Sequence, residues 1–191
     1  MRERRNSLRM IIAFGLLALL VAGKNVIRSE RGPFSKILTF GGYRFQVDAS
    51  VTETKRLLQI RAVRGNTLLT AFHLPIDRPV LDAHVADLDD NHFPEIYLFL
   101  SSDGSGSLGR VIGWQFLSQR KAEIKAEGWQ LNDGSYMGHD SLWIEAGVLC
   151  RRFPVYRPGD ANAQPSGGVR TIRYQLQAAG EQFILKPAGN E

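Results

Sequence analysis

The sequence predicts an all-β protein, an antiparallel β-sandwich of about eight strands preceded by an N-terminal signal or anchor helix. Two observations predict the sandwich. From residue 36 onward, short stretches rich in β-branched and aromatic residues alternate with turn signals at intervals of about ten residues, a pattern typical of sandwiches and barrels. In this part of the chain, helical periodicity is confined to one short segment, residues 118–127.

The individual elements follow from the same pattern. Gly41 and Gly65 mark compact turns between the first strands, and residues 118–127 (SQRKAEIKAE) are expected to form a short helix. Residues 160–168 (DANAQPSGG) have the composition of a long loop. Strands are expected at 37–40, 43–47, 57–63, 67–74, 83–88, 95–101, 110–117, 141–146, 148–156, 169–177 and 182–186.

Residues 1–23 have the composition of an export signal. Four arginines precede the uninterrupted apolar run at 10–22, whose 13 residues are short for a membrane span and fit the core of a signal peptide. The sequence before Lys24 departs from the usual small-x-small cleavage pattern, which leaves an uncleaved anchor open as the alternative. We expect a periplasmic or secreted protein, or one anchored in the inner membrane through residues 10–22 and facing the periplasm.

Composition limits the functions expected of the remaining chain. Residues 24–35 are expected to form a linker, and residues 36–191 are expected to form one β domain. The segment 1–23 carries four arginines and one glutamate, so without it the net charge of +5 falls to +2. The high pI therefore gives no reason to expect nucleic-acid binding. Cys150 is the only cysteine, which excludes an intramolecular disulfide, and no histidine pair has the spacing of a zinc motif. We expect no cofactor, and the sequence leaves a homodimer open.

Residues 104–109 (GSGSLG) lie between two expected strands and are therefore expected at the tip of a β-hairpin. This sequence matches the dinucleotide fingerprint G-x-G-x-x-G. Dinucleotide binding, however, needs a helix that begins at the third glycine, and the segment from Arg110 is a poor helix start. The serines lack the G-x-S-x-G pattern of a nucleophile elbow, and we expect no enzyme activity. Because glycine permits close backbone approach, such a tip can enter a narrow cleft on a partner, whereas a surface hairpin without a role is the simpler alternative.

The acidic segment 87–95 (DLDDNHFPE) places oxygen-bearing side chains at alternate positions, an arrangement that can converge on Ca²⁺. However, His92 stands where calcium loops of this kind have a glycine, and the motif occurs once. Aspartates also cap tight turns through hydrogen bonds to the backbone. We therefore expect a structural turn without a metal. The weak metal candidates are Asp87, Asp89, Asn91 and Glu95.

Residues 136–140 (YMGHD) form a second glycine-containing loop that bears an aromatic residue. If this loop lies beside residues 104–109, the two make a compact protruding surface with one aromatic anchor. The tryptophans, Trp114, Trp129 and Trp143, are expected to fill the core, with a sugar-stacking platform as the alternative.

Several short motifs, in this order and spacing, resemble the family of bacterial periplasmic inhibitors of invertebrate-type lysozyme. The resemblance covers about residues 37–186, nearly all of the expected β domain. The motifs are the acidic turn 87–95, the strand start Glu95-Ile96-Tyr97, the loop 105–109, the loop 136–140, Arg152-Phe153-Pro154-Val155-Tyr156 and the segment 165–174.

The resemblance implies an antiparallel β-sandwich whose Ser/Gly loop enters the active-site cleft of a lysozyme as a plug. This chain has Leu108 where the family commonly has tyrosine, so affinity or target choice would differ. A bulky residue in place of Gly106 is expected to block insertion without disturbing the fold. The alternative function is an envelope module that binds Ca²⁺ or carbohydrate. The residues implied at the interface are Ser105, Gly106, Ser107, Leu108 and Gly109, with Arg110 and Tyr136 in support.

Overall fold

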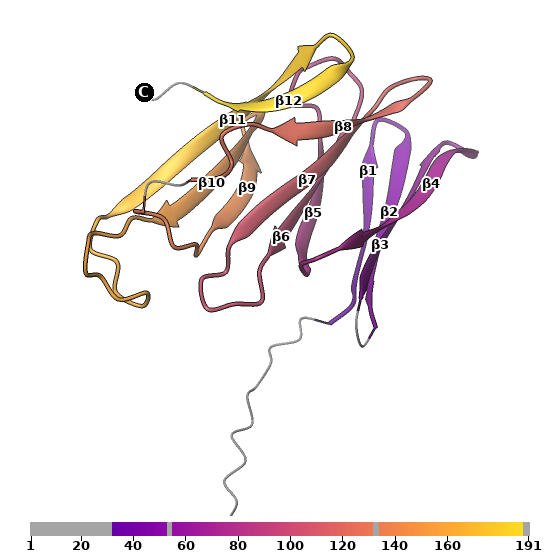
Figure 1. The fold of residues 1–191 in the computed structure, drawn as a ribbon. Coiled ribbons are helices and arrows are strands. Elements are labelled where there is room, and N and C mark those ends of the chain that lie inside the picture. Colours follow the sequence, from indigo (N-terminus) through magenta and orange to yellow (C-terminus); the bar gives the residue numbers. More distant parts are fainter. Residues whose placement is uncertain (1–31, 53–54, 132–133, 189–191) are drawn as a thin grey trace, which may run out of the picture.

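The structure is a computed structural model that describes residues 32–52, 55–131 and 134–188 (Figure 1). Within these ranges the chain forms twelve β-strands and no helix. None of the described residues belongs to a helix long and apolar enough to cross a membrane. The expected signal or anchor helix lies outside the described residues. The strands are β1 (Phe34–Phe40), β2 (Tyr43–Val51), β3 (Arg56–Arg64), β4 (Thr67–Ile76), β5 (Val80–Ala86), β6 (Glu95–Ser101), β7 (Gly109–Phe116), β8 (Lys121–Ala126), β9 (Ser141–Glu145), β10 (Val148–Pro154), β11 (Val169–Ala179) and β12 (Gln182–Pro187).

The strands form two sheets. The first four strands make a four-stranded antiparallel sheet in the order β1-β2-β3-β4, drawn in indigo and purple in Figure 1. The other eight make a sheet in the order β5-β6-β7-β8-β12-β11-β10-β9. All neighbouring pairs in the larger sheet are antiparallel except β8 and β12.

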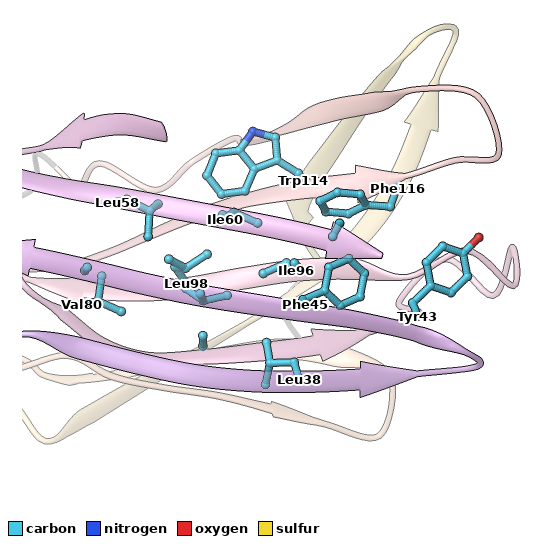
Figure 2. Packing of buried hydrophobic residues seen from close by; sticks show 14 of the residues in the cluster. Leu38, Tyr43, Phe45, Leu58, Ile60, Val80, Ile96, Leu98, Trp114 and Phe116 are labelled. Carbon is cyan, nitrogen blue, oxygen red and sulfur yellow. The ribbon is translucent and has the colours of Figure 1, made fainter. Parts of the chain in front are cut away.

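The first hydrophobic core lies between the four-stranded sheet and one face of β5, β6 and β7 (Figure 2). Ile96 and Leu98 point from β6 toward Phe45 and Ile60 of the smaller sheet, and all four are at most 1% exposed. Trp114 of β7 lies next to them in this core and is 6% exposed. These alternate apolar positions hold the two sheets together by removing their inner faces from water.

The second core lies on the opposite face of β6, where the eight-stranded sheet packs against itself. Tyr97 and Phe99 point from β6 into this core, which also contains Leu149 of β10 and Tyr174 of β11. Each face of β6 packs into a different core, so all seven residues of this strand are buried. This two-sided burial explains why the strand is a continuous apolar run rather than an alternating one.

The predicted fold class is confirmed, since the described chain is all-β and its two sheets form a sandwich. The predicted detail needs correction: the described residues form twelve strands rather than about eight, and one pair is parallel. β1 begins at Phe34, inside the expected linker. The turn at Gly65 and the long loop at 160–168 are confirmed.

The expected helix at 118–127 is wrong, because residues Lys121–Ala126 form β8. The segment consists of good helix formers, yet Ala122, Ile124 and Ala126 alternate on the inner face and pack against the second core. Pairing with β7 on one side and β12 on the other supplies the backbone with hydrogen bonds. This tertiary pairing overrides an intrinsic helix preference of a few tenths of a kcal/mol per residue.

Candidate functional site

The connection between β6 and β7 is a narrow loop closed by its own hydrogen bonds. The backbone N–H of Ser102 donates to the carbonyl of Leu108 at 3.0 Å, and the Leu108 N–H donates to Ser102 Oγ at 2.8 Å. Within the loop, the Ser107 N–H donates to the Gly104 carbonyl at 3.1 Å. The side chains of Ser105 and Leu108 are left on the surface, and Leu108 is 38% exposed.

The loop at residues 136–140 lies directly against this tip, as required for the compact surface that we expected. The His139 N–H donates a hydrogen bond to the Gly106 carbonyl. A Cβ on Gly106 would lie 2.6 Å from the Met137 carbonyl oxygen, and one on Gly138, whose φ is +96°, would lie 1.9 Å from the Gly106 oxygen. The expectation that a bulky residue at Gly106 leaves the fold intact is therefore wrong. Gly106 is required because two backbones meet there.

A buried ion pair anchors the same two loops to the second core. Asp140 accepts a hydrogen bond from the Gly109 N–H at 2.6 Å and forms an ion pair with Arg151 Nε at 2.6 Å. The Asp140 and Arg151 side chains are 0% and 1% exposed. The Arg151 guanidinium packs over the Trp129 ring at 4.6 Å, and Trp129 Nε1–H donates to the Gly109 carbonyl at 2.9 Å.

Tyr136 supports this ion pair from the side. Its hydroxyl donates a hydrogen bond to Asp140, and its ring lies 4.8 Å from the Arg151 guanidinium and 5.0 Å from the Phe153 ring. Burial, followed by the hydrogen bond to Asp140, raises the pKa of Tyr136 well above its usual value. The hydroxyl is thus engaged inside the protein, and Tyr136 acts on the loop through Asp140.

A third loop, between β10 and β11, also contacts the tip. Asn162 Nδ2 donates to the Ser105 carbonyl at 3.5 Å, and its Oδ1 lies 3.2 Å from His139 Nε2. The Tyr156 hydroxyl fixes Asn162 by donating to its carbonyl at 2.8 Å. Figure 1 shows the β6–β7 and β10–β11 loops at the same end of the molecule. The tip is therefore held by contacts with two neighbouring loops, residues 136–140 and the β10–β11 loop.

Two arginines lie near the exposed Leu108. Arg78 Nη1 donates to the Leu108 carbonyl at 3.0 Å, and Arg110 forms an ion pair with Asp77 at 3.3 Å while its side chain stays 49% exposed. A groove of about 730 Å³ runs beside the tip and is lined by Leu108, Arg110, Val111, Lys125, Trp129 and Gln130, among others. The surface combines hydroxyls, one apolar side chain and positive charge, which suits an acidic, hydrogen-bonding cleft.

The acidic turn at 87–94 lies at the opposite end of β6. Asp87 accepts backbone N–H groups of Asn91 at 3.0 Å and His92 at 2.8 Å, and Asn91 Oδ1 accepts the Phe93 N–H at 2.8 Å. These are the backbone hydrogen bonds expected of a structural turn. His92 has a φ of 67°.

Glu95 lies at the base of this turn and is fully buried. Its Oε2 accepts the Leu88 N–H at 2.8 Å, whereas Oε1 has no hydrogen-bond partner among the described residues. Burial raises the pKa of Glu95 to about 8, and the charges of Asp89 and Asp87 add to the rise. The carboxylates of Asp87, Asp89 and Glu95 lie within 4.8 Å of one another.

The three tryptophans have different positions. Trp114 is in the first core and Trp129 packs half-buried against the second, so these two fill the core as expected. Trp143 belongs to neither core and is only partly buried, with its Nε1–H donating to Glu145 at 3.1 Å. Together with Arg152 and Ser141, it lines a shallow hollow on the face of β9 and β10.

Sequence reasoning identified the two loops but missed the residues that join them. Arg151 gave one weak signal, namely a charge at an inward position of the strand Val148–Pro154. Asn162 and Arg78 gave none, because their roles depend on contacts 57 and 30 residues away in the chain.

Comparison with known proteins does not assign the chain to a family. No family model matches the chain, and no curated protein matches it. The fold and the site therefore define the class of the protein, which is a β-sandwich that presents a braced hairpin loop.

Proposed function

We propose that the protein is an exported inhibitor of a lysozyme, most closely suited to the invertebrate type, and that residues 105–109 enter the active-site cleft. The observation that carries the proposal is the bracing of this tip, which accepts hydrogen bonds from His139 and Asn162 and donates one to Asp140. A loop already held in one conformation loses little entropy on binding, so more of its contact energy appears as affinity.

The chemistry of the tip fits a cleft that binds glycans. Glycosidase clefts carry paired carboxylates and hydrogen-bonding groups for sugar hydroxyls. Ser105 offers an exposed hydroxyl, and Arg110 offers an exposed positive charge next to the tip. Leu108 supplies an apolar contact at the centre, where the resembled family commonly has tyrosine.

The test measures cell-wall clearing by invertebrate-type, chicken-type and goose-type lysozymes with the purified protein. We expect Leu108→Ser to weaken inhibition by about tenfold, because it removes the apolar contact at the centre of the interface. The matched control is Leu69→Ser on β4, since Leu69 and Leu108 are both 38% exposed. Leu108→Tyr is expected to preserve or improve inhibition.

Two results would contradict the proposed function or the role of the loop. Equal inhibition by wild type and Leu108→Ser would exclude this loop as the inserted element. An absence of inhibition across all three lysozymes would overturn the proposed function.

The carbohydrate-binding alternative depends on Trp143, the partly buried ring beside Arg152 and Ser141. An exposed indole can stack on a sugar ring. Binding of soluble peptidoglycan fragments that Trp143→Ala abolishes and Leu108→Ser leaves unchanged would favour this function over inhibition.

A further inference from the structure

We propose that the turn between β5 and β6 binds a divalent cation of the calcium type, held by the carboxylates of Asp87, Asp89 and Glu95. This site lies at the opposite end of β6 from the loop at 102–108 and does not depend on the proposed function.

The carboxylate spacing fits a shared cation. Oxygen atoms from Asp87, Asp89 and Glu95 lie within 4.8 Å of one another. Oxygen ligands sit roughly 2.3–2.6 Å from Ca²⁺, so two ligands of one ion are at most about 5 Å apart. Three ionised carboxylates this close repel one another, and a bound cation would offset that repulsion. Among the described residues, no Lys or Arg forms an ion pair with them, and the one histidine near them is the exposed His92, whose Nδ1 lies 3.9 Å from Asp87 Oδ2.

Buried oxygens without partners occur at this turn and on the strand residue paired with Glu95. Glu95 Oε1, Asp89 Oδ1 and Gln115 Oε1 are buried and have no hydrogen-bond partner among the described residues. Glu95 and Gln115 are both 0% exposed and lie opposite each other on β6 and β7. Gln115 Nε2 donates to the Phe93 carbonyl at 3.0 Å, which places its amide against the turn. Buried oxygens without partners are costly, and a bound cation would satisfy them.

Two sequence arguments stood against a metal, the histidine at the glycine position of the loop and the single copy of the motif, and the structure bears on the first. In the structure His92 has a φ of 67° and Asp90 a φ of 57°, so the turn already has the left-handed conformation that glycine usually supplies. The hydrogen bonds that Asp87 accepts do not exclude a ligand role, because each carboxylate oxygen can accept more than one partner. The histidine at this position is therefore no argument against a metal.

The donor set selects the class of ion. The donors of Asp87, Asp89 and Glu95 are all oxygen, which favours hard cations over zinc, whose usual ligands are sulfur and nitrogen. Their arrangement within an irregular turn suits Ca²⁺, which accepts variable geometry, better than Mg²⁺, which requires an octahedron and retains its waters.

The experiment uses the full chain after treatment with chelator. Isothermal titration with CaCl₂ is expected to give saturable binding near one ion per chain, and Ca²⁺ is expected to raise Tm in a way that excess chelator reverses. Asp89→Asn and Glu95→Gln keep the side-chain shape and remove one charge each, and each is expected to weaken calcium binding at least tenfold. The matched control is Asp48→Asn, an aspartate of the four-stranded sheet that is hydrogen-bonded to Ser35. It is expected to bind calcium as the wild type does.

Three results would overturn the site or its assignment. Neither binding heat nor a Tm change with Ca²⁺, Mg²⁺ or Mn²⁺ would exclude a cation site. Equal affinity in the wild type, Asp89→Asn and Glu95→Gln would place the ion elsewhere. Tighter binding of Mg²⁺ than of Ca²⁺ would overturn the calcium assignment. If Glu95→Gln does not fold, Asp89→Asn alone decides, because Asp89 is only partly buried. Lysozyme inhibition measured in chelator below Tm is expected to be unchanged, so failure of one proposal is distinguishable from failure of the other.

Discussion

At the scale of single residues, Arg151 does most to fix the candidate site. Its guanidinium neutralises Asp140 where both side chains are buried, and it also donates to the Trp129 carbonyl at 2.5 Å. Asp140 in turn binds the backbone of Gly109, the residue at which β7 begins. One ion pair therefore sets the position of the hairpin tip relative to the second core.

Replacing Arg151 by methionine is expected to lower the free energy of unfolding by about 3–5 kcal/mol, because Asp140 would remain as a buried, unpaired charge. Lys36→Met is the control, since the Lys36–Asp82 pair is 2.6 Å long but its side chains are 37% and 43% exposed. That substitution is expected to cost less than about 1 kcal/mol. Urea unfolding measures both, and equal losses for the two variants would contradict the assigned role of Arg151.

At the scale of elements, the site depends on contact between loops that are far apart in sequence. The β6–β7 loop touches residues 136–140 through the backbone at Gly106 and Gly138, and it touches the β10–β11 loop through Asn162. Such contact leaves no room for a Cβ, so the glycines hold the loops together by their lack of a side chain.

Gly138→Ala is expected to destabilise the fold by about 1–3 kcal/mol, because its φ of +96° and its distance to the Gly106 oxygen both exclude a side chain. It is also expected to weaken lysozyme inhibition by displacing the tip. Gly104→Ala is the matched control in the same region, since no atom lies within 4 Å of its Cβ position. Thermal unfolding and the clearing assay would contradict the bracing if both alanine variants behaved alike.

At the scale of the whole molecule, β6 joins the two cores. Ile96, Leu98 and Leu100 face the four-stranded sheet, and Tyr97 and Phe99 face the interior of the larger sheet. Neither core can lose its packing while β6 stays native. The two sheets are therefore expected to unfold together.

This coupling predicts a single transition in urea. Far-UV circular dichroism, which reports strands throughout, and tryptophan fluorescence, which reports Trp114 in one core and Trp129 in the other, are expected to give the same midpoint. Phe45→Ala is expected to cost about 3–5 kcal/mol and to move both signals equally. Loss of fluorescence at a lower urea concentration than loss of strand signal would show that the sheets unfold separately.

The sequence by itself determined the fold class, the hairpin at Gly65, the loop at 160–168 and the two glycine-containing loops of the site. These are local properties, since turn residues and alternating apolar residues act within a few positions of the chain. Only the tertiary structure decided that Lys121–Ala126 is a strand, that Arg151 meets Asp140 and that Gly106 must be glycine. Each of these outcomes depends on a partner brought close by folding, and distance along the chain carries no information about such contacts.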